Sequence, residues 1–226
     1  MNLTLVSCSY NTPEVTMNMI NSFKKYHPTT PILISENSNN ENTTILLEEM
    51  GIDYIRNAGF HHSIGVDSLI DHCKTEYILL VDTDVLFLSS INPLYHKIYY
   101  DKISICGVMQ GNRGGLKLHN RICPWFCFIN IEQLKSKNIK FFDSIRFSQH
   151  LTEQKTEMIY DVGATLLEDV INNNMTVLPI TESIQDMYIK HFEGMSWRKD
   201  SKNLGLELLA EQTELQYKKF LKENII

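Results

Sequence analysis

Long hydrophobic runs are absent from this sequence of 226 residues. No stretch approaches the ~18 consecutive apolar residues that a membrane-spanning helix requires. The opening MNLTLVSCSYN has no basic segment and no extended apolar segment, so it does not resemble a secretory signal peptide. We therefore expect a cytoplasmic protein without a transmembrane segment.

A metal-binding cysteine pattern is also absent. The five cysteines are an odd number scattered along the chain, and Cys123 and Cys127 in CPWFC do not have the spacing of a zinc knuckle. His119 and His150 lie nearby in the sequence but complete no recognised pattern. We expect free thiols in a reducing compartment.

The chain has no excess of positive charge. It contains 21 Lys and Arg against 27 Asp and Glu, a net charge of −6, which argues against nucleic acid as a partner. Its 43% of hydrophobic and 21% of charged residues are ordinary for a globular protein. The length fits one large domain or two small ones.

Strands and helices alternate in the first 90 residues. The predicted strands are 3–9, 31–36, 52–57 and 77–81, and the predicted helices between them are 13–26, 43–50 and 62–75. This β-α alternation predicts an α/β fold with a mostly parallel central sheet and helices on both faces, and it favours one domain.

The second half of the chain is less regular. We expect strands at 103–110, near WFCFINI, at 176–180 and at 187–192, and helices near IEQLKSKN, at 162–173 and from Leu204 onwards. The last of these helices mixes Leu204, Leu208, Leu215 and Phe220 with KKFLKE. We expect it to pack on the domain or on a partner subunit, with peripheral membrane contact as the alternative.

Two carboxylates interrupt the apolar run YILLVDTDVLFL. Asp82 and Asp84 could form a charged turn, an acid/base pair or a site for Mg²⁺ or Mn²⁺. A period of two places both side chains on the same side of an extended chain, which suits holding one cation together. Asn11 and Glu36 lie at the ends of other predicted strands, and ligands collect at the carboxyl ends of parallel strands. We therefore favour the metal site.

Four segments in this order resemble a known family. VSCSYNTPE, ISENSNNE, NAGF and EYILLVDTD are similar to the nucleotide-sugar half of the GT-A glycosyltransferases, especially those of family 2, over roughly residues 3 to 90. The resemblance implies a single Rossmann-like GT-A domain over 1–226. Residues 1–90 would form its nucleotide-sugar-binding half, 91–200 its acceptor and catalytic half, and 201–226 a C-terminal helix.

The resemblance also implies roles for the residues at the strand ends. Ser9 and Asn11 would lie beside the nucleotide, and Glu36 takes the place of the usual Asp that contacts the uracil ring. Asp84 would be the principal ligand of a cation that bridges the diphosphate. Asp82 would lie closer to the ribose or reach the metal through water.

Two further segments resemble elements of such enzymes. HHSIGVDSLIDHC would place His62, Gly65 and Asp67 near the donor, the alternative being a solvent-facing His62 and a polar helix face. MYIKHFEGMSWR is similar to a His-x-x-Gly…Trp element in which the histidine, here His191, is a third metal ligand; the alternative is a core histidine. Arg198 in this segment could neutralise phosphate charge.

Asp161 in YDVGATLLEDV is the candidate general base. In inverting GT-A enzymes an acidic residue stands at about this point, and the alternative is that Asp161 caps the following helix. If it is only a cap, a retaining mechanism becomes the better interpretation. For the acceptor, which could be a glycan, a lipid-linked sugar or a protein, the candidate residues are Arg113 in QGNRGG, Trp125 and Trp197.

The sequence thus predicts a metal-dependent glycosyltransferase that uses a nucleotide-diphosphate sugar, with UDP-sugar as the first choice of donor. A sugar-1-phosphate nucleotidyltransferase is disfavoured because VSCSYNTPE has neither the Gly nor the Arg of the loop that such enzymes carry after their first strand. A non-catalytic nucleotide- or carbohydrate-binding domain of the same fold ranks last, since both Asp82 and Asp84 are present.

Overall fold

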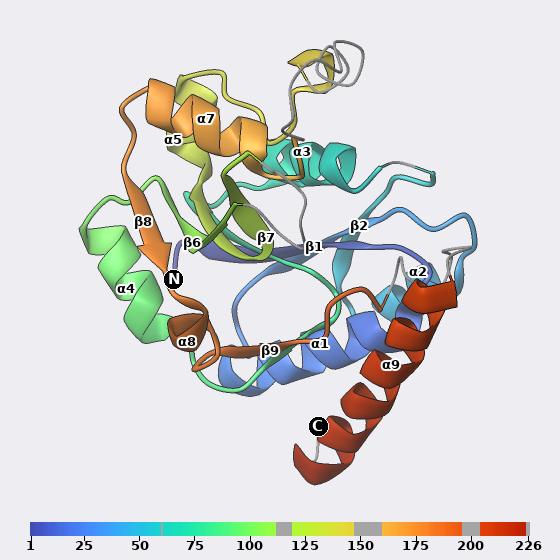
Figure 1. The fold of residues 1–226 in the computed structure, drawn as a ribbon. Coiled ribbons are helices and arrows are strands. Elements are labelled where there is room, and N and C mark those ends of the chain that lie inside the picture. The colour runs from blue at the N-terminus through green and yellow to red at the C-terminus, as the bar shows by residue number, and fades with distance from the viewer. Residues whose placement is uncertain (60, 112–118, 147–159, 196–203, 225–226) are drawn as a thin grey trace.

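The computed structural model describes residues 1–226 except 60, 112–118, 147–159, 196–203 and 225–226. A seven-stranded sheet forms its centre, in the strand order β3-β2-β1-β4-β7-β6-β8 (Figure 1). These strands are β1 (Leu3–Ser9), β2 (Ile32–Glu36), β3 (Asp53–Arg56), β4 (Tyr77–Val81), β6 (Ile105–Gln110), β7 (Arg121–Asn130) and β8 (Val177–Ile180).

The first four strands are all parallel, as the alternating pattern predicts. β1 lies between β2 and β4, and β3 is added at the outer edge of β2. β7 pairs antiparallel with both β4 and β6, while β8 runs parallel to β6. The sheet is therefore mixed but mostly parallel, and the β4–β7 pair joins the two halves of the chain.

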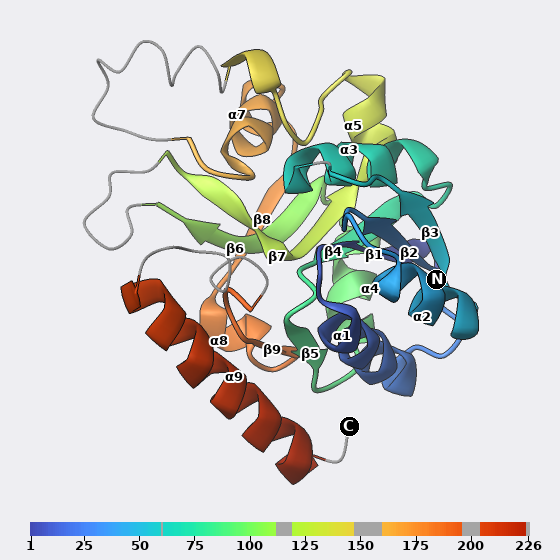
Figure 2. The ribbon, with the colours of Figure 1, turned by 90° about the vertical axis from the view of Figure 1, so that its right-hand side faces the viewer.

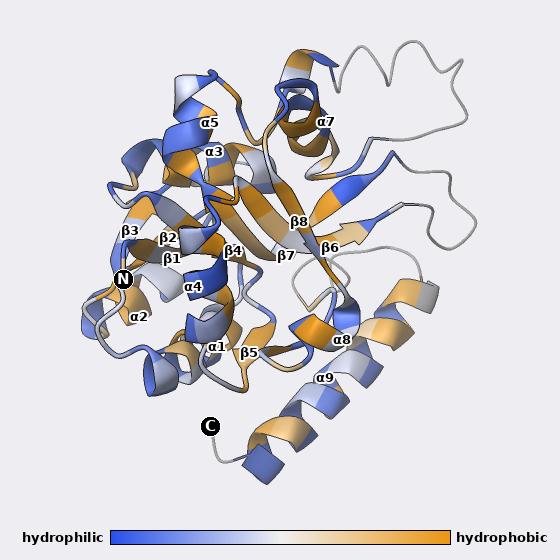
Figure 3. Cartoon of the chain, turned by 90° about the vertical axis from the view of Figure 1, so that its left-hand side faces the viewer, coloured by the Kyte–Doolittle hydropathy of each residue, from blue (hydrophilic) through white to orange (hydrophobic). Residues whose placement is uncertain are grey.

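Helices cover both faces of the sheet (Figures 1 and 2). Those of one face are α1 (Pro13–Tyr26), α2 (Asn42–Glu49) and α4 (Asn92–Tyr100), and those of the other are α3 (His62–His72), α5 (Ile131–Ser136) and α7 (Ala164–Asn172). The strands alternate between the two cores: in β4, Leu79 packs with Phe23 of α1, whereas Leu80 packs with Leu69 of α3. Figure 3 shows the resulting hydrophobic centre between more polar outer surfaces.

A small second sheet lies apart from the large one. It pairs β5 (Val85–Phe87) antiparallel with β9 (Ile189–His191), and α8 (Glu182–Gln185) precedes β9. The predicted strand at 187–192 is thus shorter in the structure. Because β5 follows β4 after only three residues, the turn that carries Asp82 and Asp84 lies at the junction of the two sheets.

The last helix, α9 (Leu204–Asn224), packs on the domain, which is the first of the expected outcomes. It docks through Tyr217, which lies against Phe192, while Leu208 and Leu215, two of the leucines expected to pack, are 53% and 69% exposed. The helical phase of α9 places these leucines on the outer side. Within the described residues, no helix combines the length and the apolar character needed to cross a bilayer.

All five cysteines are free and buried, where the sequence predicts free thiols that are buried or half-buried. Helix α4 was not foreseen, and α7 begins at Ala164 instead of Val162. Gly163 is the cause of the later start, because its φ of 87° is left-handed and does not belong to a right-handed helix. The position requires glycine, since a Cβ there would clash with the Ile122 carbonyl oxygen.

Candidate active site

A pocket of about 540 Å³ opens at the carboxyl ends of β1 and β4, where the parallel sheet predicts a ligand site. It takes side chains from both halves of the chain. The residues that line it are Cys8, Tyr10, Asn37, His61, His62, Asp82, Thr83, Asp84, Arg121, Pro124, Trp125, Asp161, Val162, His191, Glu193 and Gly194.

Asp84 is held by the turn that follows β9. Its Oδ2 accepts hydrogen bonds from the backbone N–H groups of Gly194 at 3.0 Å and Met195 at 3.2 Å. Its carbonyl oxygen accepts a third, from the N–H of Phe192 at 2.9 Å. The backbone of residues 192–195 therefore orients the Asp84 carboxylate, with Oδ1 directed towards the pocket.

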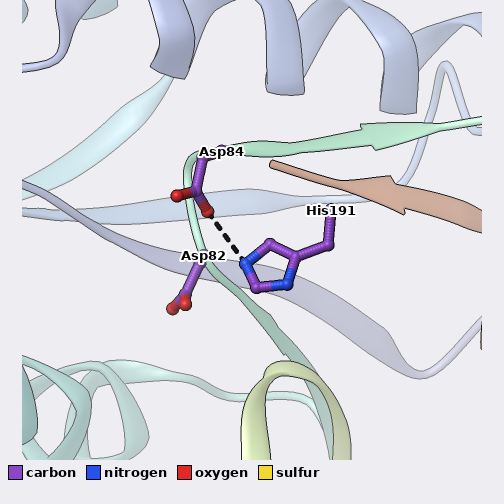
Figure 4. A group of neighbouring side chains, drawn as sticks. All are labelled: Asp82, Asp84 and His191. Carbon is purple, nitrogen blue, oxygen red and sulfur yellow. Dashed lines mark ion pairs between the residues drawn. The ribbon is translucent and has the colours of Figure 1, made fainter. Parts of the chain in front are cut away.

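Strand pairing brings His191 to the two aspartates. His191 lies opposite Val85 in the β5–β9 pair, and its Nε2 stands 3.3 Å from Asp84 Oδ1 (Figure 4). On the other side, His62 Nε2 lies 3.4 Å from Asp82 Oδ1. Each aspartate of the DTD motif therefore faces one imidazole.

Asp82, Asp84 and His191 fit a divalent cation. Each offers a ligand atom, and the three atoms lie within 4.8 Å of one another. Asp84 Oδ1 and His191 Nε2 are buried and make no hydrogen bond within the described part of the chain. Buried polar atoms are rarely left without a partner, so both atoms are consistent with ligation. Two carboxylates with an imidazole suit Mn²⁺ better than Mg²⁺.

The charges of the site also shift its proton equilibria. Burial alone would raise the pKa of Asp82, but the nearby His62, His191 and Arg121 bring that pKa below its ordinary value. Burial opposes protonation of His191, yet Asp84 and Asp82 raise its pKa above the ordinary value. The opposite shifts mark a compact set of interacting charges.

Asp161 forms the opposite wall of the pocket. Its Oδ2 lies 2.6 Å from Arg121 Nη1, and its Oδ1 accepts a hydrogen bond from the N–H of Val162 at 2.7 Å. The alternative role as the cap of α7 is wrong, because Gly163 occupies the N-cap position. Asp161 is thus a pocket residue that an arginine holds in place.

Trp125 lies between the two walls. Its ring stacks on that of His191, with centroids 4.9 Å apart and planes 21° apart, and the Arg121 guanidinium lies 5.5 Å from the Trp125 ring centroid. The indole Nε1–H donates to Gln185 Oε1 at 2.9 Å. The sequence predicts a sugar-stacking tryptophan, but in the structure the Trp125 ring already packs against His191.

The predicted donor residues at the ends of β1 and β2 do not line this pocket. Ser9 is buried and shares a hydrogen bond with Thr16 Oγ1. Asn11 adopts a left-handed φ of 53°, and its N–H donates to Ser38 Oγ. Tyr10, between Ser9 and Asn11, and Asn37, next to Glu36, line the pocket instead. Successive residues at a strand end point in opposite directions, so the neighbour of a buried residue faces the pocket.

Glu36 is fully buried and already has partners. Arg56 Nη1 lies 2.6 Å from its Oε2, and Ser38 donates to it from both its N–H and its hydroxyl group. The longer side chain of Glu, compared with the usual Asp, turns into the protein to meet Arg56. In this structure Glu36 therefore holds the end of β2.

Asp67 also binds protein groups outside the pocket. Its carboxylate accepts hydrogen bonds from the N–H groups of Phe141 and Phe142. Burial outweighs these bonds and raises its pKa to about 6. Gly65 packs α3 against the sheet, since a Cβ there would lie within 2.9 Å of Cys8 Sγ and Ser35 Oγ. His62 reaches the pocket.

Three predicted site residues, Arg113, Trp197 and Arg198, lie outside the described residues. Conversely, Arg121 was not identified as a site residue, although it is 5% exposed and contacts Asp161. Its signal in the sequence was a lone charged residue at the start of the apolar run RICPWFCFIN. Tyr10, Asn37 and Glu193 carry no comparable signal.

Comparison with known proteins decides the family. The family model described as glycosyl transferase family 2 matches residues 4–153, which is more than half of the chain. The chain belongs to glycosyl transferase family 2. Comparison of this glycosyltransferase with curated proteins found no match.

Solved structures share the fold at low sequence identity. Residues 1–349 of S. aureus TarS with UDP align with a TM-score of 0.57 at 13% identity, covering 99% of this chain and 74% of that one. The mannosyltransferase PcManGT from Pyrobaculum calidifontis, with GDP-Man and Mn²⁺, aligns with a TM-score of 0.60 at 10% identity, covering 96% and 69%. For the galactosyltransferase LgtC, with donor and acceptor sugar analogues, the TM-score is 0.53 at 16% identity, covering 93% and 95%.

This glycosyltransferase spans 43% of the length of the longer TarS chain that it matches. The family match confirms the resemblance and the enzyme class predicted from the strand-end segments. The structural neighbours confirm the GT-A fold, with its Rossmann-like, mostly parallel sheet.

Proposed function

We propose that this glycosyltransferase moves a sugar from a nucleotide-diphosphate sugar, with UDP-sugar as the first choice, to a hydroxyl group in a metal-dependent reaction that inverts the anomeric centre. The observation that carries the proposal is the group of Asp82, Asp84 and His191 in a pocket that also contains Asp161. TarS with UDP and PcManGT with GDP-Man and Mn²⁺ support a donor and a cation of these kinds.

Asp84 Oδ1, His191 Nε2 and an Asp82 oxygen would hold Mn²⁺ or Mg²⁺. The cation supplies charge stabilisation for the departing diphosphate when it is bound. The hydrogen bonds from Gly194 and Met195 to Asp84 Oδ2 keep Oδ1 turned towards the site, so little reorganisation is needed. His62, at the start of α3, would lie beside the donor phosphates.

Asp161 would take the proton of the acceptor hydroxyl group. Arg121 and the Val162 N–H each occupy one side of its carboxylate, and a carboxylate has about four lone-pair sites, so both oxygens can still accept a hydrogen bond. The carboxylate is fixed in direction yet open to the pocket. A positioned base of this kind contributes about 10²–10⁴-fold to the rate.

The proposal assigns residues 1–90 to donor binding, 91–200 to the acceptor and catalysis, and 201–226 to the C-terminal helix. The pocket draws on both halves, with Asp82 from the first and Asp161 from the second. The acceptor would be a glycan, a lipid-linked sugar or a protein.

Thermal unfolding with UDP, GDP, CMP and dTDP, each with and without Mn²⁺, tests the donor and the metal together. A ligand at about 100 times its Kd stabilises the protein by ~2.7 kcal/mol. We expect one nucleotide to raise Tm only with Mn²⁺, and Asp84→Asn to remove the shift while keeping an oxygen for the Gly194 N–H. Asp71→Ala removes an exposed carboxylate of α3 and serves as the control. No shift from any nucleotide in the folded wild type contradicts the proposal.

A further inference from the structure

The imidazole of His191 has no hydrogen bond to a protein group of the described residues that would fix its plane. Ligating histidines almost always donate their second ring N–H to a carboxylate, a carbonyl group or water, which fixes the plane of the ring. Among the described residues no hydrogen bond to either nitrogen of His191 is found; Nε2 faces Asp84 at 3.3 Å. The β5–β9 pairing places the backbone of His191 but leaves rotation of its ring free.

Packing against Trp125 supplies the missing constraint. The indole lies nearly flat on the imidazole, with centroids 4.9 Å apart and an angle of 21° between the planes. Trp125 belongs to β7, which lies between β4 and β6 in the large sheet. A ring stacked in this way can slide slightly, but it cannot tilt out of the plane that directs Nε2 to Asp84 Oδ1.

Gln185 in turn fixes the indole. Its Oε1 accepts the Trp125 Nε1–H at 2.9 Å, and Gln185 is 5% exposed at the end of α8. The backbone carbonyl oxygen of Gln185 accepts a hydrogen bond from the N–H of Tyr188 at 2.8 Å, and Tyr188 directly precedes β9. Gln185 therefore ties the tryptophan to the same short segment that carries His191.

We infer that Trp125 and Gln185 are positioning residues that hold the His191 imidazole in the orientation needed for the cation, an inference that rests on the proposed metal-dependent function. Trp125 then acts on the metal ligand instead of stacking on an acceptor sugar. Loss of a contact that supports a metal ligand typically lowers metal affinity about 10–100-fold. If Trp125 positions His191, its replacement therefore weakens metal binding even without an acceptor. If Trp125 stacks on a sugar, its replacement weakens only acceptor binding.

The test is titration with Mn²⁺ alone, in which electron paramagnetic resonance measures the free ion. We expect Trp125→Leu to weaken Mn²⁺ binding about 10–100-fold. Trp125→Phe, which keeps a flat ring but no longer donates to Gln185, is expected to restore part of it. Gln185→Leu, which removes the acceptor of the indole N–H, is expected to weaken binding several-fold and serves if Trp125→Leu does not fold. The control is Phe128→Leu, another buried aromatic of β7, which is expected to lower Tm with unchanged Mn²⁺ affinity.

Equal Mn²⁺ affinity in wild type and Trp125→Leu, or in wild type and Gln185→Leu, overturns the inference and leaves the proposed function standing. A raised KM for the acceptor with unchanged Mn²⁺ affinity does the same and favours sugar stacking. A folded wild type that binds no Mn²⁺ overturns the metal site of the proposed function, and the inference with it.

Discussion

Arg121 and Asp161 form an ion pair of 2.6 Å in the wall of the pocket. Arg121 is almost fully buried, and its Nε and Nη2 groups also donate to Gln110 Oε1, which directs the guanidinium. The side chain of Asp161 is 40% exposed, so one face of its carboxylate meets the pocket. A buried arginine thus presents an accessible carboxylate, which is the geometry that a general base requires.

Asp161→Asn is expected to lower kcat by about 10²–10⁴-fold, because the amide can no longer take a proton. Tm should change little, since the amide oxygen can still accept hydrogen bonds from Arg121. Steady-state kinetics with the donor identified by thermal shift measure the loss, and NMR of the product gives its anomeric configuration. Activity within tenfold of wild type, with retained configuration, excludes Asp161 as the base.

Asp67 predicts a pH dependence of stability. Its pKa is raised from 3.8 to about 6, so the folded chain binds its proton more tightly than the unfolded chain does. Stability from this group is therefore present below pH 4 and is lost as the pH rises to about 6. At 1.36 kcal/mol per pKa unit the loss is on the order of 1–3 kcal/mol.

Urea unfolding of wild type and Asp67→Asn at several values between pH 4 and pH 7 measures this effect. The asparagine still accepts the Phe141 N–H but does not titrate, so the difference in unfolding free energy between the two proteins should change with pH. A difference that stays constant over the range shows that Asp67 does not titrate there.

Gly65→Ala should destabilise the end of the sheet near the pocket. The added Cβ would lie 2.8 Å from Asn37 Nδ2 and 2.9 Å from both Cys8 Sγ and Ser35 Oγ. Relief requires movement of Ser35, which donates to Asn37 and accepts from Asn57. We expect a loss of about 1–2 kcal/mol, since overpacking costs ~1–3 kcal/mol and alanine recovers part of it through helix propensity.

The control for Gly65→Ala is Asp71→Ala, an exposed position on the same helix, for which chemical denaturation should show less than about 0.5 kcal/mol. Weaker nucleotide binding by Gly65→Ala is also expected, because Asn37 lines the pocket. An alanine variant as stable as wild type shows that moving the three side chains apart costs no more than alanine gains in helix propensity.

Tyr217→Ala is expected to loosen α9 from the domain. Tyr217 is 2% exposed, packs edge-on against Phe192 at 5.0 Å, and its hydroxyl oxygen accepts a hydrogen bond from Asn18 Nδ2 at 3.0 Å. Removal of a buried aromatic ring costs about 3–5 kcal/mol. The backbone amides of α9 should exchange their hydrogens faster. Mn²⁺ affinity should also fall, because Phe192, which loses its contact with Tyr217, donates its N–H to the Asp84 carbonyl oxygen.

Leu215→Ala is the matched control for Tyr217→Ala. Leu215 lies on the same helix but is 69% exposed, so its replacement should change stability by no more than about 0.5 kcal/mol. Equal effects of the two substitutions would mean that α9 does not dock through Tyr217.

Much of the first half of the fold could be predicted from local pattern. The β-α alternation of the first 90 residues determined a parallel sheet, and a parallel sheet brings its strand ends to one edge. Asp82 and Asp84 could therefore be located at that edge, and the His191 segment could be linked to them through its resemblance to a known element. These inferences succeed because strand periodicity and strand direction are properties of short stretches of chain.

The partner of each polar group was decided only by the tertiary structure. Glu36 ends its strand as predicted, yet Arg56 from the neighbouring strand binds it inside the protein. Arg121, by contrast, reaches Asp161 because β7 inserts antiparallel beside β4. A buried charge takes whichever opposite charge the packing brings within reach, and that choice depends on strand order and side-chain direction across the whole sheet, which no short stretch of sequence contains.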